Sequence, residues 1–346
     1  MRAVVIRAHG GPEVLELTDI ERPEPGDGEV LLRVRAVSVN AFLDVSNRAG
    51  HVPFARYEFP HVLGSEHAAE IAALGSNIDA SFAVGDAVIA SNTVPCRVCD
   101  ECAAGHDERC GQLGIIGVNR PGAYAEYTVV PAHVLRLIPP GVSFEDASAL
   151  GVNGPLAVAQ LLAADATAGQ TVMVQAAGSS SGSMALLVAR AMGLSTIGTT
   201  RSAERAQVLR DLGVADEIVV SSEPDAAEQV RALTSDRGAD VVLDNLAARD
   251  AWALTIASLA MGGAIVTSGA KFGGRVEVDL RSLYTFNQRI IGVRTSNAAA
   301  KDRLWKLVAD NALRPLVDSV VPLEEVADAH RRIEAGQNIG RVVLAV

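Results

Sequence analysis

Short apolar runs alternate with stretches of helical periodicity in the middle of this chain, and this alternation constrains the fold more than any other feature. The run Thr171–Gln175 precedes the helical pattern Met184–Met192, and the run Ser195–Thr199 precedes the pattern Ala203–Leu212. The succession continues to Ala264–Ser268. Strands that alternate with helices of about ten residues form right-handed βαβ crossovers. We therefore predict an α/β domain with a parallel sheet.

The first third of the chain has another pattern, rich in Val, Gly and Pro. Glu29–Val39 alternates apolar and polar residues, as a half-buried strand does. The segment after Ile290 is more like this first third than like the middle of the chain. We expect a discontinuous β-rich domain of residues 1–151 and 295–346, with a sheet domain of residues 152–294 inserted into it.

Composition narrows the classes of protein. Of 346 residues, 49% are hydrophobic and 21% are charged, which is typical of a globular protein and excludes a disordered or fibrous chain. The 30 Lys and Arg against 41 Asp and Glu leave no basic excess for nucleic acid. No apolar stretch reaches the roughly 18 residues of a membrane span, and the N-terminus shows no secretory signal. We predict a cytoplasmic protein that acts on a small molecule, without nucleic acid or membrane partners.

All four cysteines lie in a lobe of residues 95–111, spaced Cys96-x2-Cys99-x2-Cys102-x7-Cys110. Two disulfides are the alternative, but a long cytosolic chain with its own core does not need them. Four thiolates at these intervals can surround one tetrahedral zinc ion. Because the protein supplies every ligand, we predict a structural zinc. His106 is a less favoured ligand.

Small residues fill the turn between the strand that begins at Thr171 and the following helix. A phosphate can approach the backbone only where side chains are minimal, and it then meets the positive end of the helix. The usual G-x-G-x-x-G pattern is degraded here, so the placement between strand and helix carries the prediction. The predicted cofactor-binding residues of the turn are Gly178, Ser179, Ser180, Ser181 and Gly182.

The next strand ends without the acidic residue that NAD-binding units carry about 20 residues beyond the glycine turn. Thr200 occupies that place. Arg201 and Arg205 can pair with a 2′-phosphate, and Thr200 and Ser202 can donate hydrogen bonds to it. The sequence therefore predicts NADPH rather than NADH as cofactor.

Several longer segments resemble the medium-chain dehydrogenase/reductase superfamily, which includes the zinc-containing alcohol dehydrogenases. The resemblance covers nearly the whole chain, and its most specific segment is the ending RPLVDSVVPLEEVADAHRRIEAGQNIGRVVLAV. Others are the opening MRAVVIRAHGGPEVLEL, the segment HVLGSEHAAEIAALG and the four-cysteine lobe. The resemblance implies a GroES-like β-rich catalytic domain, a Rossmann doubly wound parallel sheet, an active site in the cleft between them, and a homodimer or homotetramer.

This chain departs from zinc alcohol dehydrogenases at the catalytic metal. Those enzymes place a Cys, a His in Gly-His-Glu and a further Cys or Asp at three positions. This chain has Asn40 there (or Ala41, since one extra residue sits before Asp44), then Ser65, and then Val152 or Asn153. The resemblance then points to the zinc-free branch of quinone oxidoreductases and alkene reductases. We expect hydride transfer from NADPH to an activated C=C (enone, enal or enoyl thioester) or to a quinone.

The same resemblance suggests further site residues. Asn40 is expected to orient the nicotinamide ribose or the substrate oxygen, and Tyr57 either donates a proton or only shapes the wall. Asp44 is expected to be a structural capping or ion-pairing residue, and Arg341 to reach the cofactor. Nicotinamide contacts are expected at the carboxyl ends of strands, at Asn245, Gly269 and Ala270.

Two other functions remain open. One is an alcohol dehydrogenase or carbonyl reductase, with or without a metal site rebuilt around Glu66 and His67. The other is a non-enzymatic paralogue that keeps NADPH binding.

Overall fold

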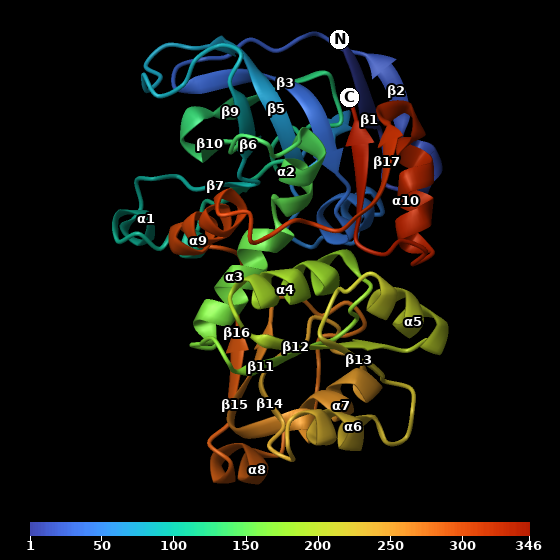
Figure 1. Cartoon of the computed structure of the whole chain (residues 1–346). Coiled ribbons are helices and arrows are strands. Elements are labelled where there is room, and N and C mark those ends of the chain that lie inside the picture. The colour runs from blue at the N-terminus through green and yellow to red at the C-terminus, as the bar shows by residue number, and fades with distance from the viewer. The chain divides into compact units, whose positions relative to one another are not determined.

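A computed structural model describes residues 1–346, which divide into two compact units (Figure 1). Unit 1 comprises Met1–Val152 and Pro315–Val346, and unit 2 comprises Asn153–Arg314. The second boundary lies 20 residues beyond the expected one at residue 294. Helix α9 (Ala298–Ala309) packs against α3 (Asn153–Ala163), where Gly154 leaves room for the Leu304 side chain. This packing joins residues 298–309 to unit 2.

Unit 2 contains the predicted parallel sheet, with six strands in the order β13-β12-β11-β14-β15-β16. Helices α3, α4 and α5 lie on one side of the sheet, and α6 and α7 lie on the other (Figure 1). The strands are β11 (Thr171–Val174), β12 (Ser195–Thr200), β13 (Glu217–Val220), β14 (Ala239–Leu243), β15 (Leu259–Thr267) and β16 (Arg289–Gly292). The remaining helices are α4 (Ser180–Ala191), α5 (Ala203–Asp211), α6 (Ala226–Leu233), α7 (Arg249–Ser258) and α8 (Leu280–Thr285).

Burial on both faces explains why these strands read as continuous apolar runs. Every residue of β11 is buried, and β11 pairs in parallel with β12 on one side and β14 on the other. A sheet covered by helices on both faces has no solvated face that would select polar residues. The order reverses between β11 and β14, which is where doubly wound sheets bind ligands, outside the carboxyl ends of the strands.

Unit 1 is β-rich, as predicted, and its largest sheet runs β10-β6-β5-β3-β18-β17, with β9 also paired to β3. Its strands are β1 (Arg2–Ile6), β2 (Glu16–Asp19), β3 (Glu29–Ser38), β4 (His61–Val62), β5 (Glu66–Leu74), β6 (Ala87–Ala90), β7 (Thr93–Val94), β8 (Gly114–Ile115), β9 (Tyr127–Pro131), β10 (Leu135–Leu137), β17 (Val317–Pro322) and β18 (Arg341–Ala345). Its helices are α1 (Asp100–Ala103), α2 (Phe144–Leu150) and α10 (Val326–Glu334).

The end of the chain completes this sheet. Strand β18 pairs antiparallel with the end of β3, with Val343 opposite Ser38 and Ala345 opposite Ala36. Strand β17 then adds to β18 in parallel. The discontinuity of unit 1 therefore follows from a sheet whose adjacent strands come from the two ends of the sequence.

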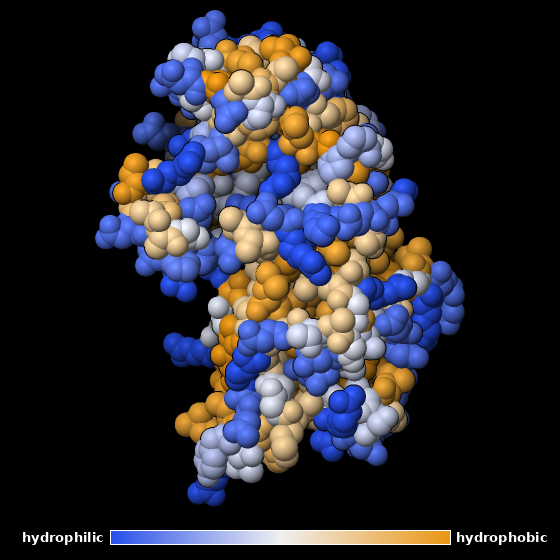
Figure 2. Space-filling view, turned by 60° about the vertical axis from the view of Figure 1, so that its left-hand side comes forward, coloured by the Kyte–Doolittle hydropathy of each residue, from blue (hydrophilic) through white to orange (hydrophobic).

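Hydrophilic and hydrophobic residues intermingle on the surface (Figure 2). One segment of unit 2 is unusually apolar for a surface: the exposed fractions of Met261, Phe272, Leu280 and Tyr284 are 73%, 59%, 68% and 71%. No helix is both long enough and apolar enough to cross a lipid bilayer.

Candidate active site

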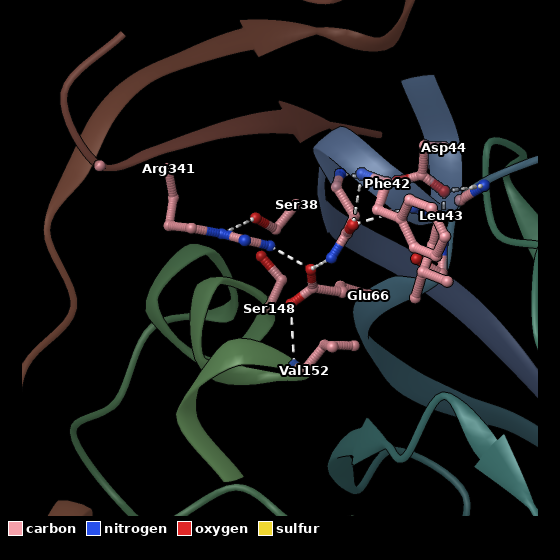
Figure 3. A network of polar contacts seen from close by, with 12 residues as sticks. Ser38, Phe42, Leu43, Asp44, Glu66, Ser148, Val152 and Arg341 are labelled. Carbon is pink, nitrogen blue, oxygen red and sulfur yellow. Dashed lines mark hydrogen bonds and ion pairs between the residues drawn. The ribbon is translucent and has the colours of Figure 1, made fainter. Parts of the chain in front are cut away.

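A buried carboxylate, Glu66, is the centre of a polar network in unit 1 (Figure 3). Its Oε1 accepts a hydrogen bond from Asn40 Nδ2 at 2.7 Å and forms an ion pair with Arg341. Its Oε2 accepts from the backbone N–H of Val152 at 2.8 Å. Arg341 in turn donates from Nε to Ser38 Oγ at 2.8 Å. Glu66 and Arg341 are 0% and 1% exposed, so the charges neutralise each other where water does not reach them.

Asn40 follows β3 and precedes an unusual turn. Residues Ala41–Ser46 form a π-helix, and Asn40 Oδ1 caps it by accepting from the backbone N–H groups of Phe42 and Leu43, both at 2.9 Å. A π-helix holds one residue more per turn than an α-helix, and such turns are frequent at functional sites. Both polar ends of the Asn40 amide are therefore bound within the protein, and its contact with a cofactor or substrate stays a prediction.

Asp44 fixes the same turn from inside. Its Oδ2 accepts from the backbone N–H of Asn40 at 2.8 Å, and its Oδ1 accepts from those of Gly64 and Ser65 at 3.2 and 3.1 Å. The expected capping role is confirmed. Burial raises the pKa of Asp44 to about 7, and the charge of Glu66 adds to that rise while the backbone hydrogen bonds oppose it.

Tyr57 lies in the loop after the π-helix, where it is half-buried. Its hydroxyl donates to Asn47 Oδ1 at 3.2 Å, and its ring stacks on His61 with 3.9 Å between ring centroids. Burial raises the pKa of Tyr57. With His9, Arg56 and other loop residues it lines a cavity of about 670 Å³. The phenolic proton is thus held by Asn47, and a role in proton transfer stays a prediction.

The structure does not bring Glu66 and His67 into one metal site. Consecutive residues of a strand point to opposite faces of the sheet, and both oxygens of Glu66 are already bound. His67 is 0% exposed, and neither ring nitrogen has a hydrogen-bond partner. Burial lowers its pKa to about 4.

The four cysteines converge in the lobe around α1. The Sγ atoms of Cys96, Cys99, Cys102 and Cys110 all lie within 4.8 Å of one another, and Cys96–Cys102 and Cys99–Cys110 are each 4.0 Å apart. Zinc–sulfur bonds of about 2.3 Å place tetrahedral sulfurs roughly 3.8 Å apart, so the cluster fits one structural zinc. These spacings are about twice a disulfide bond. His106 stays outside the cluster, half-exposed beside Glu108.

The nucleotide turn of unit 2 has the predicted geometry. Ser179 precedes α4, and its Oγ accepts from the backbone N–H of Gly182 at 3.0 Å. A Cβ atom at Gly182 would lie 2.2 Å from the carbonyl oxygen of Ala176, so only glycine allows this approach of helix to turn. Ala176 itself adopts the left-handed conformation, with φ of 57°. Ser180 and Ser181 form the first turn of α4, at the positive end of the helix dipole that favours an anion.

The predicted phosphate-selecting residues meet this turn at one point. Arg205 lies against Gly178, since a Cβ atom there would be 3.0 Å from an Arg205 guanidinium nitrogen. Ser202 caps α5 by accepting from the backbone N–H of Arg205 at 3.2 Å. Thr200 is buried at the end of β12, whereas the Arg201 side chain is exposed. Arg205 therefore lies beside the turn that would hold the phosphates, and a contact of Arg201 with a 2′-phosphate stays a prediction.

The expected nicotinamide contacts lie at the carboxyl ends of β14 and β15. Asn245 Oδ1 accepts from the backbone N–H of Ser268 at 2.7 Å. Gly269 is next in sequence, and a Cβ atom there would lie 3.3 Å from the Asn245 carbonyl oxygen. The structure brings Asn245, Gly269 and Ala270 together at one edge of the sheet. Arg341 belongs to unit 1, where it is part of the Glu66 network, and its contact with the cofactor stays a prediction.

Sequence reasoning missed the Glu66–Arg341 ion pair and the role of Gln160, whose Nε2 donates to Asn245 Oδ1 at 3.1 Å. A signal existed for both. Each is a polar residue inside an apolar run, and polar groups buried in such runs need partners. The sequence shows that a partner exists without showing which one.

Comparisons with known proteins agree with this architecture. Residues 26–140 match the family described as alcohol dehydrogenase GroES-like domain, and residues 182–310 match that described as zinc-binding dehydrogenase. A protein named NAD-dependent alcohol dehydrogenase from Sulfolobus acidocaldarius is 30% identical, with 100% of each chain covered. Human quinone oxidoreductase is 29% identical over 99% of this chain and 97% of its own.

Two further matches complete the comparison. Acryloyl-coenzyme A reductase from Metallosphaera sedula is 29% identical, with 99% of each chain covered. The solved structure of an NAD-dependent alcohol dehydrogenase superposes with a TM-score of 0.92 at 36% identity, again with 100% of each chain covered. This chain, with its GroES-like and nucleotide-binding domains, belongs to the medium-chain dehydrogenase/reductase superfamily of oxidoreductases.

Proposed function

We propose that this oxidoreductase transfers hydride from NADPH to an activated C=C or a quinone, without a catalytic zinc. The observation that carries the proposal is the closed network around Glu66. Where a zinc alcohol dehydrogenase has a thiolate and an imidazole, this chain has the amide of Asn40 and the hydroxyl of Ser65. The one remaining acid, Glu66, has both oxygens engaged by cations and N–H donors.

In this reaction the protein has to place the cofactor beside the substrate and stabilise the charge that develops. When bound, NADPH supplies a hydride, so the cofactor is oxidised to NADP+ as one carbon of the alkene is reduced, and a proton from solvent or a side chain completes the other carbon. Charge develops on the carbonyl oxygen as an enolate, which hydrogen-bond donors stabilise. Tyr57 is the candidate donor in unit 1, provided that its hydroxyl leaves Asn47. The four-cysteine lobe would hold a zinc that only stabilises the fold.

Preference for NADPH is supported by Arg205, whose guanidinium lies beside the nucleotide turn, and by the exposed Arg201 side chain that follows β12. We expect Arg201→Glu and Arg205→Glu each to weaken NADPH binding by about 10- to 100-fold, the worth of a charge-assisted hydrogen bond, while NADH binding changes little. Titration of both cofactors by fluorescence measures this. If both variants keep the wild-type preference for NADPH, the assignment of the 2′-phosphate site is wrong.

The reaction class is tested by two measurements on the purified protein. Elemental analysis is expected to find one zinc per chain. Loss of NADPH absorbance is expected with quinones, enals, enones or acyl-CoA esters, and no NADP+ reduction with simple alcohols. A second zinc per chain together with alcohol oxidation would overturn the proposal. Tight NADPH binding with no accelerated oxidation across the panel would favour the non-enzymatic paralogue.

The second candidate is an alcohol dehydrogenase or carbonyl reductase, favoured by the names of two similar proteins. We also propose that the protein is cytoplasmic and forms a homodimer or homotetramer. The exposed apolar residues Met261, Leu280 and Tyr284 support self-association, because such residues on a surface favour burial against another chain. Sedimentation equilibrium measures the oligomeric state.

A further inference from the structure

A pair of amides at the carboxyl end of β14 has only one orientation. Asn245 Oδ1 lies 2.7 Å from the backbone nitrogen of Ser268 and 3.1 Å from Gln160 Nε2. A backbone N–H can only donate, so the Asn245 atom facing it must be the amide oxygen. Gln160 on α3 is 2% exposed, and it must then present its own N–H to the same oxygen.

This arrangement leaves one group of the Asn245 amide free. Both donors converge on Oδ1, and Nδ2 has no partner in the protein. Asn245 is partly exposed, so its two N–H bonds are available to a ligand at this edge of the sheet. Gly269 lies beside it with no side chain, which keeps the edge open. The site is thus a fixed donor next to a bare stretch of backbone.

The position of Asn245 identifies which part of a cofactor it meets. A dinucleotide crosses the point where the strand order reverses, with one mononucleotide on each half of the sheet. The phosphate-binding turn and Arg205 lie on the β11–β12 half, so the adenosine belongs there. Asn245 follows β14, the first strand of the other half, where the nicotinamide would lie.

We propose that Asn245 Nδ2 donates a hydrogen bond to the carbonyl oxygen of the nicotinamide carboxamide, and that Gln160 is the positioning residue that holds the Asn245 amide in this orientation. The inference rests on the proposed use of a nicotinamide dinucleotide. A nicotinamide ring can enter in two orientations, related by a half-turn about its bond to the ribose, that present opposite faces to the substrate. A donor fixed on one side selects the orientation in which the carboxamide oxygen meets it.

Asn245→Asp tests the donor with little change of shape. The carboxylate still accepts from Ser268 and Gln160 but has no N–H to offer. NADPH affinity is expected to fall about 5- to 20-fold, the worth of one hydrogen bond, whereas the affinity for 2′-phospho-ADP-ribose, which lacks the nicotinamide, stays within twofold. Asn287→Asp is the matched control: it adds the same charge before β16, at the opposite edge of the sheet, and is expected to change neither affinity.

Gln160→Glu tests the positioning residue. The new carboxylate accepts rather than donates, so it attracts Nδ2 and competes with the ligand for it. A drop in NADPH affinity of several-fold is expected, again without loss of 2′-phospho-ADP-ribose binding. Gln160→Met removes the donor without adding an acceptor, and its effect is expected to be smaller, because Ser268 still holds Oδ1.

Cofactor analogues supply a readout that a purely structural role would not move. Sulfur accepts hydrogen bonds weakly, so the wild type is expected to bind the thionicotinamide analogue of NADP+ several-fold less tightly than NADP+ itself. The 3-acetylpyridine analogue keeps the carbonyl oxygen and is expected to bind as NADP+ does. In Asn245→Asp the difference between NADP+ and the thio analogue is expected to vanish.

Two outcomes overturn the inference. One is an Asn245→Asp variant that binds NADPH as tightly as wild type. The other is an equal loss of NADPH and 2′-phospho-ADP-ribose affinity, which would indicate general damage to the fold. Failure of the wild type to bind either ligand would instead overturn the proposed function, and this inference with it.

Discussion

The two units each contain a buried polar centre, and the two centres differ in what they leave unbound. Glu66 in unit 1 is charged, and both of its oxygens accept from the protein, Oε1 from Arg341 and Asn40 and Oε2 from the backbone of Val152. Asn245 in unit 2 is neutral, and it keeps one donor free. The comparison suggests that a charged, closed centre serves stability, whereas a neutral, half-open one serves recognition. Mutations should separate these roles.

The largest effect is expected from breaking the ion pair. Arg341→Met leaves Glu66 as a buried charge without its counter-ion, which typically lowers the free energy of unfolding by about 3–5 kcal/mol. Urea unfolding measures it. Arg7→Met is the control, because Arg7 and Glu16 form a solvent-exposed pair of the kind that contributes at most about 1 kcal/mol. Similar losses in the two variants would contradict a stabilising role for the Glu66 network.

A smaller loss is expected in unit 2 from Thr255→Val. The Thr255 hydroxyl donates to Asp244 Oδ2 at 3.0 Å and accepts from Gln175 Nε2 at 3.1 Å, and all three residues are buried. Removing it leaves the Asp244 Oδ2 atom without a partner, whereas Gln175 Nε2 keeps its hydrogen bond to the Ala251 carbonyl oxygen, so the expected cost is about 1–3 kcal/mol. The restoring double variant Asp244→Asn with Thr255→Val is expected to recover part of this loss in urea unfolding. An unchanged unfolding midpoint in the single variant would show that the hydrogen bonds of the Thr255 hydroxyl are not needed for stability.

His67→Leu is expected to stabilise unit 1, and more so in acid. At pH 7 the change removes two unsatisfied ring nitrogens, worth about 1 kcal/mol. Burial lowers the pKa of His67 from 6.5 to about 4. Between these two pH values the imidazole is therefore protonated in the unfolded state and neutral in the folded state. Wild-type stability therefore falls as the pH drops from 6.5 towards 4, and the advantage of the variant grows by about 2 kcal/mol at pH 5. An advantage that is constant with pH would show that His67 is protonated in the fold.

The smallest effect on stability is expected from Asn245→Asp, although this variant is expected to lower cofactor affinity. Because the acceptor for Ser268 and Gln160 is kept, the free energy of unfolding should change by less than about 1 kcal/mol. Thermal unfolding without cofactor measures this. A loss as large as that of Arg341→Met would abolish the distinction between the two centres.

Local patterns in the sequence predicted the elements of unit 2, because strands buried on both faces and ten-residue helices leave plain periodicities. They also predicted the four-cysteine cluster and the small-residue turn before α4, which are contacts between near neighbours in the chain. They did not predict that residues 298–309 join unit 2, because that depends on how a helix fits against Gly154.

The residue pairs of the two polar centres could not be predicted from the sequence either, because they also depend on contacts between distant segments. Glu66 and Arg341 are 275 positions apart, and Gln160 and Asn245 are 85 apart. A single sequence carries no record of such pairings. The π-helix is visible in the sequence only as one extra residue between Asn40 and Asp44. That extra residue did not predict the hydrogen bond by which the Asp44 carboxylate holds the turn.

The place of β18 has a consequence for synthesis. Arg341, the first residue of β18, is synthesised 303 positions after Ser38 at the end of β3, yet β18 lies in the sheet between β3 and β17 and carries the counter-ion of Glu66. During synthesis unit 2 can be completed before β18 is made. At that stage β3 still lacks its neighbour β18, and Glu66 still lacks its counter-ion. Loss of the residues from Arg341 onward, by premature termination or by a protease, would therefore destabilise residues that were synthesised first.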